Sequence, residues 1–304
     1  MGTPEFAVPS LEALVKAGYS VVGVVTATDK YGGRGGKQLL ESPVKRAAIG
    51  LGIPVLQPKN LRATEFQEEL RSLKANLQIV VAFRMLPVAV WSMPRLGTFN
   101  LHGSLLPKYR GAAPINWAII NGERVTGATT FFIQESIDTG DVLLQHRMPI
   151  GENETAGDVH DRMMVEGAEL VLRTVRLIES SNYTLQQQDD SAATPAPKID
   201  RDTCRVDWQR PVGEVHDFIR GLSPWPAAWT MLEDAQLKII RAHLEREGHI
   251  LEAGTVVTDG KTYFKVAAPG GYVFVEELQL AGRRRMTTEE FLRGTELRPG
   301  LILG

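Results

Sequence analysis

The chain has 304 residues, enough for about two domains, each with its own hydrophobic core. Its net charge of −2, with 43% hydrophobic and 23% charged residues, is typical of a soluble globular protein. This balance excludes bulk attraction to nucleic acid, so any such partner must be bound by local basic patches. The single cysteine, Cys204, excludes an internal disulfide framework and fits a reducing compartment.

The sequence predicts neither a membrane segment nor a metal site. It has no apolar run of about 18 residues and no charged-then-apolar signal pattern at its N-terminus. We therefore expect a cytoplasmic protein with no membrane partner. The six histidines are scattered, and no H-x-x-x-H or C-x-x-C spacing occurs, so no bound metal is expected.

The first hundred residues predict alternating helices and strands. Thr3, Pro4 and Glu5 are typical of a helix start, with Thr3 as the cap. Buried strands are expected at residues 21–27 and 77–82, and helices at about 43–51 and 63–75. This alternation indicates an α/β fold with a doubly wound, mostly parallel sheet. Such a fold normally has a strand before its first helix, so we expect either that this fold lacks that strand or that the native start lies upstream of Met1.

A basic, glycine-rich loop follows the first predicted strand at residues 29–37. It is not a Walker A phosphate loop, because that motif would need glycine in place of Tyr31 and Ser or Thr in place of Gln38. Lys30, Arg34 and Lys37 could pair with phosphates, and the glycines would leave the loop mobile until a nucleic acid orders it. A flexible surface loop with a few charges is the plain alternative.

The stretch 99–114, F-N-L-H-G-S-L-L-P-K-Y-R-G-A-A-P, begins as a strand with polar residues at alternate positions. Side chains two apart on a strand share a face, so Asn100 and His102 point the same way. A loop punctuated by glycine and proline follows. Ligands of open α/β sheets bind outside the carboxyl ends of the strands, where this pair would lie. The alternative is a satisfied polar pair at a strand end.

The remaining chain completes the first domain and predicts a second, β-rich domain. Strands are expected at 126–134 and 142–149, joined by E-S-I-D-T-G-D, and a long helix at 155–179. We place an N-terminal domain at 1–180, a polar linker at 181–207 and a C-terminal domain at 208–304. One helix and five short strands there predict a small OB-like barrel, with a sandwich as the alternative. Its 12 Lys and Arg oppose 13 Asp and Glu, and Arg283 to Arg285 could bind phosphate or end a solvated strand.

Several separated motifs carry a family resemblance. The 99–114 stretch followed by I-D-T-G-D resembles the folate-dependent formyltransferases. M-G-T-P-E-F-A at the front, G-R-G-G-K in the basic loop and G-L-S-P-W-P-A-A-W in the second domain resemble the branch that formylates methionyl-tRNA. The likeness covers essentially the whole chain, with the motifs in the right order. It implies an N-terminal catalytic domain and a C-terminal tRNA-binding domain, and we expect a monomer.

The resemblance implies transfer of a formyl group from 10-formyltetrahydrofolate, the co-substrate, to the α-amino group of initiator methionyl-tRNA, without a metal. Asn100 would donate to the oxyanion, His102 would donate or relay a proton, and Asp138 would orient His102 or accept the amine's proton through water. Asp141 competes with Asp138 in the same turn, but the family motif assigns catalysis to Asp138.

The resemblance also implies binding residues. Folate contacts are expected from two segments, comprising Phe83, Met85, Leu86, Ser104, Leu105, Leu106 and Pro107. Packing at a helix start is the alternative for Met85 and Leu86. The expected tRNA contacts are Lys30, Arg34 and Lys37.

Two other functions stay open. A formyltransferase acting on a small amine, such as glycinamide ribonucleotide or an amino sugar, would share Asn100, His102 and Asp138 but would not need the basic loop or this second domain. An inactive RNA-binding or folate-binding module is the other possibility, and the intact Asn-His-Asp set argues against it.

Overall fold

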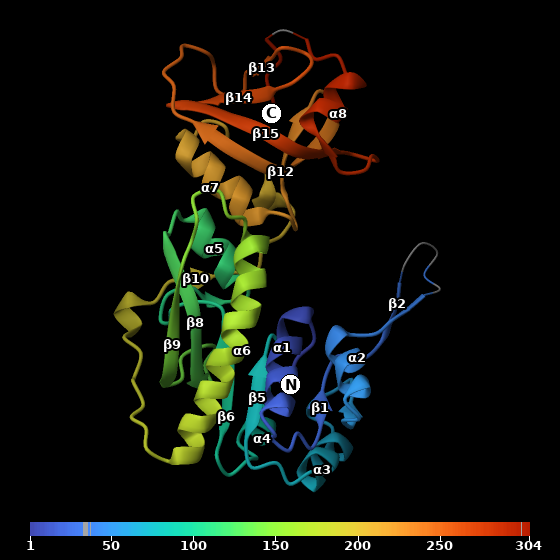
Figure 1. Ribbon diagram of the computed structural model, residues 1–304, viewed down its shortest axis with the longest axis vertical. Coiled ribbons are helices and arrows are strands. Elements are labelled where there is room, and N and C mark those ends of the chain that lie inside the picture. Colours follow the sequence, from blue (N-terminus) through green and yellow to red (C-terminus); the bar gives the residue numbers. More distant parts are fainter. Residues whose placement is uncertain (33–35, 37, 299) are drawn as a thin grey trace. The chain divides into compact units, whose positions relative to one another are not determined.

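A computed structural model describes residues 1–32, 36, 38–298 and 300–304 (Figure 1). The chain forms two compact units whose segments alternate along the sequence. Unit 1 comprises Met1–Gly111, Gly127–Met148 and His160–Pro195, and unit 2 comprises Ala112–Thr126, Pro149–Val159 and Ala196–Gly304. The domain boundaries drawn from the sequence remain predictions.

Unit 1 contains the predicted α/β sheet. Strand β1 (Val24–Val25) pairs in parallel with β4 (Val55–Leu56). A four-stranded sheet has the order β5 (Gln78–Val81), β6 (Thr98–His102), β8 (Val125–Phe132) and β9 (Val142–Pro149). Strands β5 and β6 are parallel, whereas β8 is antiparallel to β6. The α/β class is confirmed, and β8 and β9 extend the sheet at one edge, as is common in such sheets.

The first two residues of the chain join the two parallel pieces of unit 1. The Gly2 N–H donates to Val25 O at 3.1 Å, and the Val81 N–H donates to Met1 O at 2.9 Å. A Cβ at Gly2 would lie 2.6 Å from the Ala7 Cβ, so only glycine fits there. Residues 1–2 therefore lie between β1 and β5 and hydrogen bond to both strands.

The first helix starts later than predicted. A short 3₁₀ turn, η1 (Glu5–Ala7), precedes α1 (Val8–Lys16). Pro4 is the residue before this turn, its backbone is extended, and no side chain caps the helix. The prediction of Thr3 as the cap was wrong, because Thr3 lies one residue too early to reach the first free N–H groups.

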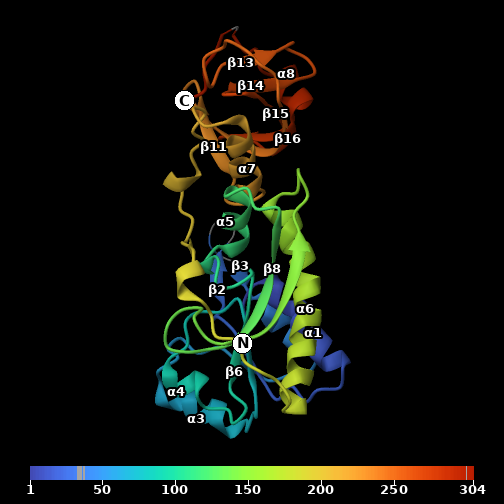
Figure 2. The same cartoon turned by 90° about the vertical axis from the view of Figure 1, so that its left-hand side faces the viewer.

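The remaining elements of unit 1 include a long helix and a separate hairpin. The long helix α6 (Ala156–Ser180), whose first turn belongs to unit 2, runs beside β8 in both ribbon views (Figures 1 and 2). The Thr174 hydroxyl of α6 and the Thr130 hydroxyl of β8 form a hydrogen bond of 2.8 Å. The other elements are α2 (Pro43–Gly50), α3 (Thr64–Ser72), α4 (Val88–Trp91), the hairpin strands β2 (Lys30–Gly32) and β3 (Gln38–Leu40), β7 (Arg110–Gly111) and the 3₁₀ turn η2 (Asp190–Ala192).

Unit 2 is built on an antiparallel sheet. Its strand order is β11 (Ala228–Leu232), β12 (Ala235–Glu245), β15 (Gly271–Leu280), β14 (Phe264–Ala268) and β13 (Val256–Thr258), with β16 (Met286–Thr287) beside β15. Helix α7 (Val212–Leu222) shares a hydrophobic core with these strands. The other elements are β10 (Pro195–Ala196), which starts in unit 1, η3 (Asp202–Cys204), α5 (Pro114–Ile120) and α8 (Thr288–Arg293).

The G-L-S-P-W-P motif marks a close helix contact inside unit 2. A Cβ at Gly221 would lie 2.6 Å from the Ile120 Cγ1 and 2.9 Å from the Ile120 nitrogen. The Asn116 side-chain amide donates to Gly221 O at 2.8 Å. Helix α5, from the stretch after the Asn-x-His motif, therefore packs directly on α7, almost a hundred residues later in the chain.

Candidate active site

His102 and Asp138 lie together in unit 1. His102, at the end of β6, is only 6% exposed, and its Nε2 lies 2.8 Å from Tyr109 O. A carbonyl can only accept, so Nε2 carries the hydrogen of this bond. The other ring nitrogen, Nδ1, lies 3.6 Å from the Asp138 Oδ2. In the neutral ring Nδ1 can therefore accept a proton, and the resulting imidazolium would face a carboxylate.

The Asp138 side chain is fixed by a backbone group. Its Oδ2 accepts the Gly111 N–H at 2.9 Å. The residue has a φ of 56°, in the left-handed region that L-residues seldom adopt. Asp141, the alternative carboxylate in the same turn, has no hydrogen bond or ion pair through its side chain to any described residue. Its backbone oxygen accepts the Phe132 N–H at 3.1 Å.

Asn100 lies on the face of β6 that carries His102, because side chains two apart on a strand point the same way. It pairs with Val80 of β5 and Phe131 of β8, in the middle of the sheet. Asn100 is partly exposed, and within the described ranges its side-chain amide has no hydrogen-bonding partner. Its N–H groups are thus free to bind a substrate oxygen.

The loop after His102 is closed by internal hydrogen bonds. The Ser104 hydroxyl donates to Lys108 O at 2.6 Å, and the Leu106 N–H donates to the Thr129 Oγ1 at 3.1 Å. Ser104 and Leu106 are buried, whereas Leu105 and Pro107 are partly exposed. Of the four residues predicted to contact folate here, Leu105 and Pro107 therefore offer the most accessible side chains.

The second predicted folate segment follows β5. Met85 is 69% exposed, Phe83 is partly exposed, and Leu86 is buried in the core cluster with Val80 and Val90. For Phe83 to Leu86, no backbone N–H or C=O is hydrogen bonded to another described residue. Free backbone donors and acceptors of this kind suit a flat ring with a donor-acceptor edge, so the segment fits a pterin.

Of the three predicted tRNA contacts, Arg34 and Lys37 lie outside the described residues. Lys30 is exposed on β2 of the hairpin. The base of this hairpin is tied to α2, because Lys45 Nζ bonds both Asp29 Oδ2, before β2, at 2.5 Å and Glu41 Oε1, after β3, at 2.7 Å. The hydrogen bond from Lys45 lowers the pKa of the Asp29 carboxyl below its usual value.

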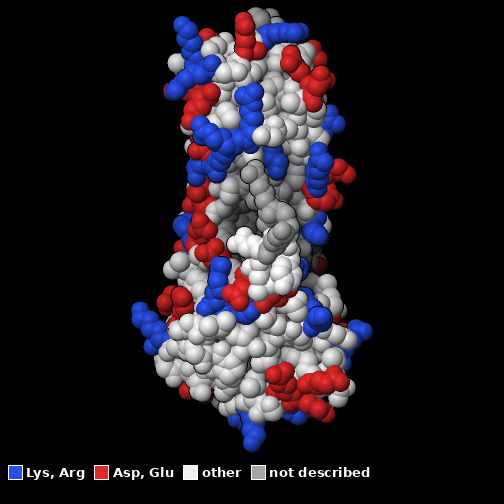
Figure 3. Space-filling view, turned by 90° about the vertical axis from the view of Figure 1, so that its right-hand side faces the viewer, with Lys and Arg blue, Asp and Glu red and all other residues white. Residues whose placement is uncertain are grey.

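The face of the molecule shown in Figure 3 carries charges of both signs. Figure 3 shows Lys and Arg interspersed with Asp and Glu over the visible face. Within the arginine triplet, Arg284 pairs with Glu290 at 2.9 Å and Arg285 pairs with Glu277. These ion pairs favour a solvated strand end over a phosphate site at this position.

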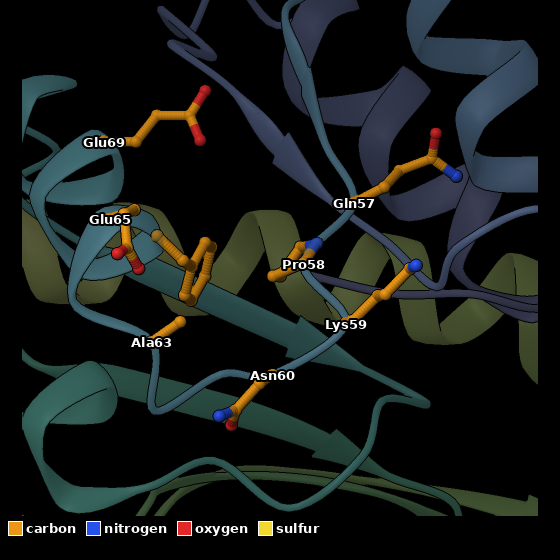
Figure 4. Close-up of a pocket in the computed structure, with 8 residues that line it drawn as sticks. Gln57, Pro58, Lys59, Asn60, Ala63, Glu65 and Glu69 are labelled. Atoms are coloured by element: carbon orange, nitrogen blue, oxygen red, sulfur yellow. The ribbon is translucent and has the colours of Figure 1, made fainter.

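A surface hollow of about 350 Å³ lies beside β4 and α3 (Figure 4). It is lined by Gln57, Pro58, Lys59, Asn60, Ala63, Glu65, Phe66 and Glu69. None of the predicted site residues lines it. The described residues contain no group of three or more His, Cys, Asp or Glu placed to hold a metal ion, and none of their helices is long and apolar enough to cross a membrane.

Two residues of the predicted linker, which no sequence pattern marks as functional, support the candidate site. Gln188 and Thr194 both hydrogen bond to segments that touch His102 and Asp138. Gln188 stands in a run of three glutamines, and no periodicity or motif distinguishes it from its neighbours.

Comparisons with known proteins agree with this architecture. The family model described as "Formyl transferase" matches residues 1–175, and "Formyl transferase, C-terminal domain" matches residues 198–296. The α/β sheet of unit 1 and the antiparallel sheet of unit 2 are thus those of a formyl-transferring enzyme. The chain belongs to the formyl transferase family.

Within this family the similarity is to the enzymes that act on methionyl-tRNA. The chain is 54% identical to the methionyl-tRNA formyltransferase of Bacteroides thetaiotaomicron, over 99% of this chain and 96% of the relative. Among solved structures, the sugar 3N-formyl transferase WlaRD has a TM-score of 0.69 at 20% identity, covering 93% of this chain and 97% of that chain. HypX from Aquifex aeolicus in complex with tetrahydrofolic acid has a TM-score of 0.60 at 22% identity, covering 83% and 45%. These two structures show the shared fold.

Proposed function

We propose that this site transfers the formyl group of 10-formyltetrahydrofolate to the α-amino group of initiator methionyl-tRNA, with Asn100, His102 and Asp138 as the catalytic residues. The observation that carries the proposal is the placement of His102 between a carbonyl acceptor and a carboxylate, on the same strand face as the unpaired amide of Asn100. The product is N-formylmethionyl-tRNA for translation initiation.

The reaction needs an oxyanion donor and a route for one proton. The neutral amine attacks the formyl carbon, a C–N bond forms, and the carbonyl electrons move to oxygen. Asn100 donates an N–H to that oxyanion. His102 accepts the amine's proton at Nδ1, where the Asp138 carboxylate stabilises the imidazolium, and the proton is then delivered to N10 of the folate as its C–N bond breaks.

The co-substrate is proposed to lie against the two segments expected from the sequence. The free backbone groups of Phe83 to Leu86 would pair with the polar edge of the pterin. Met85, Leu105 and Pro107 would supply exposed apolar contacts, and Ser104, Leu86 and Leu106 would hold the two segments in shape from their buried positions.

The tRNA is proposed to contact the basic hairpin through Lys30, together with Arg34 and Lys37. Phosphate pairing by these side chains would make binding depend on salt concentration. We also propose that the enzyme acts as a monomer in the cytoplasm, where charged initiator tRNA is available.

One assay separates the candidate functions. The protein is incubated with 10-formyltetrahydrofolate and either methionyl-tRNA or glycinamide ribonucleotide, and the formylated product is measured. We expect formylation of methionyl-tRNA, abolished by His102→Ala with folate binding largely intact. Transfer to the small amine alone would contradict the proposed substrate, and no transfer to either by the folded protein would indicate a binding module.

A further inference from the structure

One side chain of the predicted linker, that of Gln188, hydrogen bonds to the backbone next to the proposed catalytic residues. The Gln188 Nε2 donates to Asp138 O at 2.9 Å and to Gly140 O at 2.7 Å. Its Oε1 accepts from the Arg110 Nε at 3.1 Å and Nη2 at 2.8 Å. The amide therefore uses both its N–H groups and both its oxygen lone pairs, which is unusual for a residue in a polar connecting segment.

These four hydrogen bonds join two segments that meet at the catalytic carboxylate. The first is the turn at Asp138, whose left-handed backbone is unfavourable by about 1–2 kcal/mol for a residue other than glycine. The second is β7, where Arg110 precedes Gly111, the residue whose N–H binds the Asp138 Oδ2. Gln188 thus fixes the backbone of Asp138 and the donor that orients its side chain.

The same polar segment also fixes the other partner of the catalytic histidine. The Thr194 Oγ1 accepts the Tyr109 N–H at 2.9 Å, and Thr194 O accepts the Arg110 N–H at 2.9 Å. Tyr109 has a φ of 61°, and its carbonyl accepts the hydrogen of the His102 Nε2. Both groups that face the imidazole are therefore held by residues 188–194.

We propose that Gln188 is a positioning residue, which sets the geometry between Asp138 and His102 without touching the substrates. The inference rests on the proposed catalytic role of this pair. Displacement of a catalytic group by about 1 Å can lower the rate about 100-fold. Loss of the Gln188 amide should therefore reduce kcat while leaving substrate binding nearly unchanged.

The test compares Gln188→Leu with Gln187→Leu. Gln187 is the adjacent, exposed glutamine, and its side chain makes no hydrogen bond to a described residue. We expect Q188L to lower kcat for methionyl-tRNA about 10- to 100-fold with Michaelis constants for tRNA and folate within about 3-fold of wild type. Q187L should behave as wild type. Wild-type kcat in the Q188L protein would overturn the proposal.

A double-mutant cycle distinguishes positioning from a general structural effect. If Gln188 acts through the carboxylate, Q188L should change kcat less than about 3-fold when combined with Asp138→Asn. A full, additive loss in the Asp138→Asn background would overturn the proposal. If Q188L does not fold, Gln188→Glu serves instead, because it keeps the acceptor for Arg110 and loses the two donors. Absence of methionyl-tRNA formylation by the wild-type protein would instead refute the proposed function.

Discussion

Replacing Asp138 with Asn removes the negative charge of the carboxylate and nearly preserves the size and shape of the side chain. The Asp138 Oδ2 lies 3.6 Å from the His102 Nδ1, and both side chains are largely buried. At an effective dielectric constant of about 20, opposite unit charges at this distance attract by about 4 to 5 kcal/mol. Because about 1.4 kcal/mol corresponds to a tenfold change in rate, loss of this attraction for the imidazolium predicts a decrease in kcat of about 10³-fold.

The free energy of unfolding should change much less. Asparagine keeps a side-chain oxygen that can accept the Gly111 N–H, so we expect a difference within about 1 kcal/mol. The assay measures formylmethionyl-tRNA under single-turnover conditions, with urea unfolding in parallel. Asp141→Asn is the matched control, since Asp141 lies in the same turn. The reasoning is refuted if the Asp138 variant keeps more than a tenth of wild-type activity, or if the Asp141 variant loses as much.

Three further predictions concern stability and the hairpin. Gly221→Ala should lower the free energy of unfolding in urea by about 1–3 kcal/mol, because the new Cβ would lie 2.6 Å from α5. Gly213→Ala on the same helix is the control: its Cβ would meet no atom closer than 3.8 Å, so this variant should be neutral or stabilising. Equal effects would contradict the close-packing argument. Burial lowers the pKa of His216 in the folded state, so the contribution of this residue to stability is present above pH 6.5 and lost as the pH falls through the folded pKa. His216→Gln should therefore reduce the fall in Tm between pH 7 and 5. An unchanged pH dependence of Tm would argue against this role of His216. Lys45→Met should raise the Michaelis constant for tRNA about 3- to 10-fold without changing that for folate, since electrostatic contacts to phosphate depend on placement of the hairpin. Rescue by Lys45→Arg is the control, and an unchanged tRNA response would show that the hairpin base needs no such anchor.

Local sequence patterns are enough to predict the α/β class and the strand face of the proposed site. The two-residue period of a strand is a local rule, so it places Asn100 and His102 on one face without any tertiary contact. Asp138 matches a family motif, and its contact with His102 spans 36 positions of the chain, which no local pattern encodes.

The support that the remaining segments give to the proposed site depends on contacts between residues far apart in the chain. Met1 and Gly2 pair with strands whose residues lie far along the chain, and α5 packs on α7 across almost a hundred residues. No hydrophobic periodicity in the sequence marks polar residues such as Gln188 and Thr194, because they support the fold through directional hydrogen bonds rather than through a buried apolar face. Composition therefore indicated a linker for 181–207, whereas the folded backbone brings residues 188–194 against both partners of His102.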